Sequence, residues 1–140
     1  MSVEFFVDTN ILLYAHDREA GHKNRLASEI VRKGWEERSG AVSTQVLQEF
    51  YVNLRRRADP PFSRGAALRL VENYLGWHVV TNDVESIRRA VDLEGRFGFS
   101  FWDALILDAA INSGARILYT EDLSHGQRIG ALKVENPFRV

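Results

Sequence analysis

The sequence predicts an α/β fold: a central parallel sheet of about four to five strands, flanked by helices on both faces. Short apolar runs alternate with longer amphipathic segments along the chain, which is typical of strands connected by crossover helices. The length of 140 residues suits one domain with its own hydrophobic core, so we expect a single domain over residues 1–140. No internal repeat, linker or low-complexity tract divides the chain.

Five short runs are predicted as strands because apolar residues, many of them β-branched or aromatic, dominate them. In chain order they are residues 3–7, 41–43, 77–80, 116–119 and 132–135. The first run leads directly into Asp8, and Thr9 or Asn10 is predicted to cap the helix that follows.

Six segments between these strands carry apolar residues at helical spacing. In chain order they cover residues 11–16, 22–38, 45–57, 63–75, 84–94 and 101–113. Proline residues at 60–61 stop the third helix, and Asn82 or Asp83 caps the fifth. The last helix is apolar on almost every side, which predicts a central, buried position. We interpret Asp108 within it as structural and paired with an arginine.

Composition excludes several classes of protein. Apolar residues make up 45% of the chain and charged residues 26%, and the net charge of −1 argues against a globally basic nucleic-acid binder. Without an apolar run of about 18 residues or a basic signal-peptide start, we expect neither a membrane span nor secretion. The chain contains no cysteine, which excludes disulfides and thiolate metal sites and fits a cytoplasmic location.

Four carboxylates are candidates for one functional site. Asp8 ends the first strand, Glu49 lies in the first turns of the helix after strand 41–43, and Asp122 follows strand 116–119. Because parallel strands present their carboxyl ends at one edge of a sheet, these three side chains are expected near each other. Asp103 joins them if the amino terminus of its helix points to the same edge.

Each acid taken alone also has a structural explanation. Ser100 and Asp103 fit a variant of the capping box, and Asp8 can be a turn former. Glu49 can be a surface helix residue and Asp122 a loop residue. Together, however, clustered carboxylates repel one another and raise each other's pKa, unless a cation lies among them. Oxygen ligands select hard cations, so the cluster predicts Mg²⁺ or Mn²⁺ and phosphoryl transfer or phosphodiester hydrolysis.

Four segments, in this order, resemble the motifs of the PIN-domain family, and within it the VapC-type toxins of toxin–antitoxin pairs. They are Val7-Asp8-Thr9-Asn10, residues 43–50 around Glu49, residues 100–106 around Asp103, and residues 118–123 around Asp122, followed by Gly126-Gln127 and Asn136-Pro137-Phe138. The resemblance spans nearly the whole chain and implies a PIN-like fold. It also implies a Mg²⁺- or Mn²⁺-dependent endoribonuclease, the toxin of a type II toxin–antitoxin pair.

Carried over residue by residue, the resemblance makes Asp8, Glu49, Asp103 and Asp122 the catalytic acids. Asp8 and Asp103 are the expected direct metal ligands, with Glu49 and Asp122 as further candidates. The resemblance also implies that a set of polar residues orients the site; these are Asn10, Thr120 and Ser100. One position departs from the family pattern, because many relatives carry another acid where this chain has Ser124, and here Glu121 precedes Asp122 instead.

The implied partners are an RNA substrate, a small antitoxin protein and a second copy of the chain, with a higher assembly when the antitoxin is bound. The densest basic run ends the helix over 45–57: Arg55, Arg56 and Arg57 either complement the helix dipole or contact the RNA backbone. An apolar groove between the early helices is the expected antitoxin site, with candidate lining residues Tyr14, Trp35, Phe50, Tyr51, Leu54 and Phe62.

Other functions remain to be weighed against this one. A haloacid-dehalogenase-like phosphatase needs a second aspartate at the position of Asn10, and a receiver-like signalling domain needs an acidic pair with a late lysine, for which Lys133 is isolated. The alternatives that stay open are an RNA-processing nuclease without an antitoxin and a catalytically silent PIN-like binding scaffold.

Overall fold

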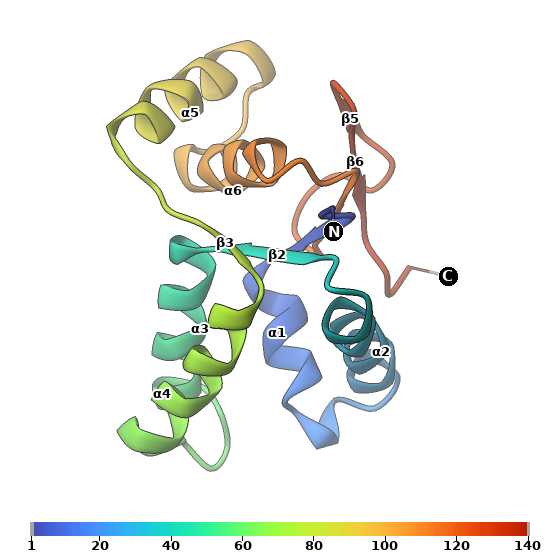
Figure 1. The fold of residues 1–140 in the computed structure, drawn as a ribbon, viewed down its shortest axis with the longest axis vertical. Coiled ribbons are helices and arrows are strands. Elements are labelled where there is room, and N and C mark those ends of the chain that lie inside the picture. The colour runs from blue at the N-terminus through green and yellow to red at the C-terminus, as the bar shows by residue number, and fades with distance from the viewer. Residues whose placement is uncertain (1, 140) are drawn as a thin grey trace.

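The computed structural model describes residues 2–139, and its strands form one sheet in the order β3-β2-β1-β4-β6-β5 (Figure 1). The strands are β1 (Phe5–Val7), β2 (Gly40–Ser43), β3 (His78–Val80), β4 (Ile117–Tyr119), β5 (Arg128–Ile129) and β6 (Leu132–Glu135). All neighbours pair in parallel except β5 and β6, which are antiparallel. The predicted parallel sheet is therefore confirmed.

The sheet has six strands, whereas four to five were predicted. The additional strand, β5, is two residues long, so it is too short to show the alternation from which strands are predicted. It forms a tight hairpin with β6, and Gly130 in the turn has a φ of +59°, a conformation that glycine adopts without a Cβ clash.

Helices cover both faces of the sheet, as predicted. The helices are α1 (Thr9–Ala15), α2 (His22–Glu37), α3 (Thr44–Arg56), α4 (Arg64–Asn73), α5 (Val84–Phe97) and α6 (Phe101–Asn112), with 3-10 turns at Arg18–Ala20 and Tyr74–Gly76. In Figure 1, α5 and α6 lie above the sheet and α1 to α4 below it. Among residues 2–139, no helix combines the length and apolarity needed to cross a bilayer.

Side-chain caps explain where several helices begin. Ser43, Ser63 and Ser100 each accept a hydrogen bond from the backbone N–H three residues later, and Asp83 forms a capping box with Ser86. The predicted cap of the first helix was wrong, because α1 begins at Thr9 and its cap is Asp8. The Asp8 carboxylate accepts from Thr9 N, so the strand ends and the helix starts at one residue.

The core lies on both faces of the sheet, because its buried apolar residues come from α6 on one face and from α1, α2 and α3 on the other. Phe6, Val7 and most of α6 are buried, which confirms the central position predicted for this helix. Asp108 is buried within it and accepts two hydrogen bonds from Arg89 on α5, at 2.7 Å from Nε and 3.3 Å from Nη2. The predicted pairing of Asp108 with an arginine is therefore confirmed, and it joins the two helices on this face.

Arg89→Met is expected to lower the free energy of unfolding by about 1–2 kcal/mol, because it leaves the buried Asp108 carboxylate without its partner. This is less than for a fully buried ion pair, since the Arg89 side chain is 47% exposed to water. Urea unfolding of the variant measures the loss. The double variant Arg89→Met/Asp108→Leu should recover most of it, and equal losses in the single and double variants would contradict a charge effect.

Candidate functional site

The four predicted acids line one cavity of about 430 Å³ at the carboxyl ends of β1, β2 and β4. Asp8 follows β1, Glu49 lies on α3, and Asp122 follows β4. The sequence did not show which way the amino terminus of the Asp103 helix points. In the structure, Asp103 lines the same cavity from the first turn of α6. The expected meeting of these side chains is thus observed, while their chemical roles stay predictions.

Asp8 is the most enclosed of the four acids, with 8% of its surface exposed. Its Oδ1 accepts from Thr9 N at 2.7 Å, and its Oδ2 accepts from the Thr120 hydroxyl at 2.8 Å. Burial raises the pKa of Asp8 from its usual 3.8 to about 6; these two hydrogen bonds oppose the shift, and the charges of Asp122 and Glu49 add to it. The two hydrogen bonds therefore fix both oxygens of the carboxylate, but they offset only part of the cost of burying its negative charge.

Two of the other acids, Glu49 and Asp122, are oriented by polar residues of the first turn of α1. The Thr9 hydroxyl donates to Glu49 Oε1 at 2.7 Å, and Asn10 Nδ2 donates to Asp122 Oδ2 at 3.0 Å. Thr120 accepts from Asp122 N at 3.1 Å through the same hydroxyl that donates to Asp8. Asn10 and Thr120 thus lie where the predicted orienting residues should be.

Two details differ from the orienting set predicted from the sequence. Thr9 contacts Glu49 directly, although its place beside Asp8 in the opening motif suggested only a helix cap. The Ser100 hydroxyl accepts from Asp103 N at 3.2 Å, so it caps α6 and acts on the backbone of Asp103 rather than on its carboxylate.

A cluster at the outer rim of the cavity fixes the loop after β4. Tyr14 donates to Glu121 Oε1 at 2.7 Å, and Lys23 forms an ion pair with the same carboxylate. The Lys23 ammonium also lies 4.9 Å from the ring centre of Tyr14 and 5.5 Å from that of Phe138. Partial burial opposes ionisation of Glu121, but the contacts with Lys23 and Tyr14 leave its pKa below its usual value.

The donor chemistry of the cavity fits a hydrated hard cation. The four carboxylates supply oxygen ligands, and Mg²⁺ typically takes one or two carboxylates directly while keeping several waters. Among residues 2–139, no three acidic or histidine side chains form a ready-made ligand cage. The acids that line the cavity are the residues that would hold such a cation, which would complete its shell with water and substrate oxygens.

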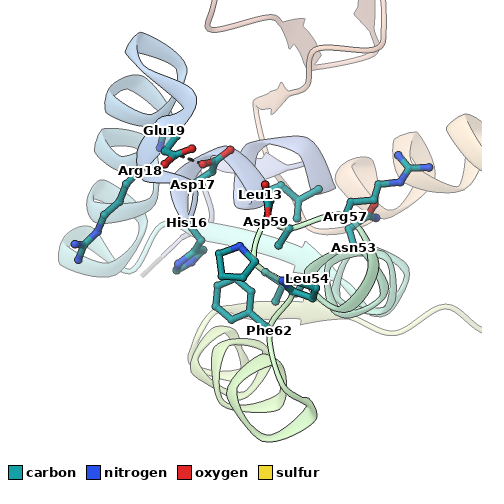
Figure 2. Close-up of a pocket in the computed structure, with 13 residues that line it drawn as sticks. Leu13, His16, Asp17, Arg18, Glu19, Asn53, Leu54, Arg57, Asp59 and Phe62 are labelled. Carbon is teal, nitrogen blue, oxygen red and sulfur yellow. Dashed lines mark hydrogen bonds between the residues drawn. The ribbon is translucent and has the colours of Figure 1, made fainter.

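A larger cavity of about 750 Å³ adjoins the acidic one and lies between the end of α1 and the turn after α3 (Figure 2). Leu13, Asn53 and Arg57 line both cavities. Of the arginines predicted to contact RNA, Arg57 therefore reaches the acidic cavity, whereas Arg55 Nη1 donates to the Phe62 carbonyl at 3.1 Å and supports the turn.

The residues predicted to line an antitoxin groove do not form one surface. Phe50 and Leu54 are almost completely buried, and Trp35 lines a different cavity with Trp77. Leu54 and Phe62 do line the larger cavity, so only part of the predicted set lies together. Their helical spacing identified apolar faces, but spacing cannot separate a core face from a groove.

The comparisons with known proteins agree with the fold. The PIN domain family model matches residues 5–128. The chain is similar to the structure of VapC20 from Mycobacterium tuberculosis, which is described as a sarcin–ricin loop cleaving toxin. The two chains are 20% identical with a TM-score of 0.65, and the match covers 85% of this chain and 90% of that chain. No curated protein sequence matches it.

The similar structures include complexes. A toxin–antitoxin complex from Klebsiella pneumoniae has a chain with 19% identity and a TM-score of 0.68, with 98% of this chain and 100% of that chain covered. The structure of VapBC2 from Rickettsia felis, bound to a DNA fragment from the promoter, contains a chain with 17% identity and a TM-score of 0.65. The match covers 95% of this chain and 98% of that chain. At these identities the likeness establishes the fold.

Asp8→Asn is expected to stabilise the cation-free protein at neutral pH. The pKa of Asp8 rises from 3.8 to about 6 on folding, so its ionisation opposes folding. The penalty grows as pH rises from about 4 to 6 and is fully present above 6, where it amounts to about 3 kcal/mol. Urea unfolding with EDTA at pH 4, 5, 6 and 7 measures the difference between the variant and the wild type.

The matched control for this series is Asp92→Asn, at an exposed carboxylate on α5 that pairs with Arg96. Its effect should stay within about 0.5 kcal/mol across the range. A difference between Asp8→Asn and wild type that does not change with pH would contradict the raised pKa.

Proposed function

Because this chain belongs to the PIN-domain family, we propose that it is a Mg²⁺- or Mn²⁺-dependent endoribonuclease and the toxin of a type II toxin–antitoxin pair. The main support is the cavity in which carboxylates from four separate elements converge. Additional support comes from the similar structures, one of them a toxin that cleaves the sarcin–ricin loop and another part of a toxin–antitoxin complex. The proposed substrate is RNA, and the proposed location is the cytoplasm.

In the proposed mechanism, Asp8 and Asp103 hold the cation. When bound, the cation polarises a phosphate oxygen and makes water a better nucleophile. Thr9 N and Thr120 hold both oxygens of Asp8, so its carboxylate is fixed before substrate arrives. Preorganisation of this kind lowers the cost of reaching the transition state.

Glu49 and Asp122 orient the attacking water. Thr9 holds Oε1 of Glu49 and Asn10 holds Oδ2 of Asp122, so each acid has its second oxygen available for the water and for its proton. Water attacks the phosphorus and forms a new P–O bond as the P–O bond to one ribose oxygen of the RNA backbone breaks. One of these carboxylates takes a proton from the water, and the leaving ribose oxygen takes a proton from solvent, which leaves one phosphate monoester end and one hydroxyl end. Arg57, at the mouth of the cavity, contacts a neighbouring phosphate.

The antitoxin is proposed to bind across the larger cavity. Its floor includes the apolar side chains of Leu54 and Phe62, while charged side chains of both signs lie around it: the acids Asp17, Glu19 and Asp59 and the arginines Arg18 and Arg57. Such a surface suits an amphipathic segment that places basic residues opposite the three acids and acidic residues opposite the arginines. A homodimer, and a larger assembly with the antitoxin, follow from the same family proposal.

Asp8→Ala and Asp103→Asn are expected to reduce RNA cleavage by at least about 100-fold, since second-shell changes at metal sites alone cost 10–100-fold. Cleaved RNA ends are sequenced after induction of the wild type and each variant, and circular dichroism confirms folding. Asp59→Asn, at a carboxylate of the larger cavity, is the control and should keep activity. A folded Asp8→Ala variant with full activity would contradict the assignment and favour a silent scaffold.

Addition of Mn²⁺ is expected to raise the melting temperature of the wild type and not of Asp8→Asn. At a concentration about 100 times Kd, a ligand that binds only the folded state adds about 2.7 kcal/mol to the free energy of unfolding. Thermal unfolding with EDTA, Mg²⁺ or Mn²⁺ provides the measurement. An equal rise in both proteins would show that the cation binds elsewhere.

A further inference from the structure

Lys23, on the first turn of α2, contacts the rim of the acidic cavity through several groups of the protein. Its ammonium forms the ion pair with Glu121 and donates to the hydroxyl of Tyr14, a residue that lines the cavity, at 3.4 Å. The rings of Tyr14 and Phe138 meet edge to face with their centres 5.2 Å apart, and the ammonium lies over both rings. A carboxylate, a hydroxyl and two aromatic rings therefore fix the position of this charge.

Glu121, the partner of Lys23, immediately precedes Asp122 in the loop after β4. Its backbone N–H donates to Asn10 Oδ1 at 3.4 Å, and Nδ2 of the same asparagine donates to Asp122 Oδ2 at 3.0 Å. Thr120 accepts from Asp122 N at 3.1 Å. The inner contacts of the loop thus come from α1 and from Thr120, while the Glu121 side chain provides an outer contact with α2.

The ion pair is too accessible to water to contribute much to the stability of the whole fold. The side chains of Lys23 and Glu121 are 34% and 25% exposed. Ion pairs that water reaches in this way add little to the free energy of unfolding, because solvent screens the charges. The effect of the pair is therefore expected to be local, on the position of the loop that carries Asp122.

From these contacts we propose that Lys23 is a positioning residue for the nuclease reaction. Its ammonium holds Glu121, and Glu121 fixes the loop so that Asp122 keeps one oxygen on Asn10 and the other available for the attacking water. The inference rests on the proposed function and deepens it, since it extends the residues that support the site to α2. Lys23 acts on the protein and contacts neither the cation nor the RNA.

The first test compares Lys23→Met and Lys23→Arg in the cleavage of a short single-stranded RNA with Mn²⁺. Methionine keeps an apolar stem over the two rings but removes the charge. The value of kcat should fall by about 10-fold, the lower end of the range for residues that support metal ligands, with little change in KM. Arginine keeps the charge and can pair with a carboxylate, so Lys23→Arg should recover most of the rate. Lys33→Met, at an exposed position on the same helix, is the control and should behave as the wild type.

A direct contact between Lys23 and the RNA backbone would give a different result. Lys23→Met would then raise KM and leave kcat nearly unchanged, and its loss would add to that of Glu121→Ala. If Lys23 acts through Glu121, the double variant Lys23→Met/Glu121→Ala cleaves no more slowly than Glu121→Ala alone. Wild-type kinetics in Lys23→Met, additive losses, or a rise in KM alone would each overturn the proposal.

The second test measures the loop itself and does not depend on cleavage. Amide hydrogen exchange of residues 120–126, followed by mass spectrometry in EDTA, reports how firmly the loop is held. Exchange there should be several-fold faster in Lys23→Met than in the wild type or Lys33→Met. Residues 40–43 of β2 should exchange at the same rate in all three proteins, since the fold as a whole is unaffected. Unchanged exchange of the loop in Lys23→Met would overturn the proposal.

The two tests distinguish this inference from the function on which it rests. If the wild type cleaves RNA, Asp103→Asn does not, and Lys23→Met behaves as the wild type in both tests, the positioning role alone is wrong. If the purified wild type with Mn²⁺ cleaves no RNA, the nuclease function is wrong and the positioning role falls with it, even where the loop of Lys23→Met exchanges faster.

Discussion

The buried carboxylate of Asp8 is the interaction on which the rest of the site depends. β1 lies between β2 and β4, so a residue at its carboxyl end is enclosed by neighbouring strands on both sides. Asp8 caps α1 with one oxygen and accepts from Thr120 with the other, yet its pKa remains raised to about 6. The fold therefore holds a rigid carboxylate whose charge is incompletely compensated, which favours a bound cation.

Three consecutive residues at this point organise two of the other acids, Glu49 and Asp122. Asp8 ends the strand with an extended backbone, whereas Thr9 and Asn10 lie on the first turn of α1, where successive side chains point about 100° apart, so the three reach in different directions. They contact Thr120 after β4, Glu49 on α3 and Asp122 in the loop after β4, respectively. One strand-to-helix junction thus links elements that are far apart in sequence, and a shift of α1 would move every one of these contacts.

The sequence predicted the parts of this arrangement that follow from local pattern. Parallel strands bring Asp8, Glu49 and Asp122 to one edge, and the caps at Asp83 and Ser100 follow from side-chain chemistry. The direction of α6, and hence the position of Asp103, depended on packing. The contacts of Glu121 with Lys23 and Tyr14 span 98 and 107 residues, and no local pattern indicates them.

Those long-range contacts decide the part that Glu121 plays. In sequence, this residue looks like a substitute for the acid that many PIN-domain relatives carry at the position of Ser124. In the structure its two oxygens are engaged by Tyr14 and Lys23, and the ammonium balances its charge. Glu121 therefore adds little net charge to the cavity and acts by anchoring the loop that presents Asp122. Among residues 2–139, the acids that line the cavity are Asp8, Glu49, Asp103 and Asp122, so the proposed cation site has no fifth carboxylate that would strengthen a second one.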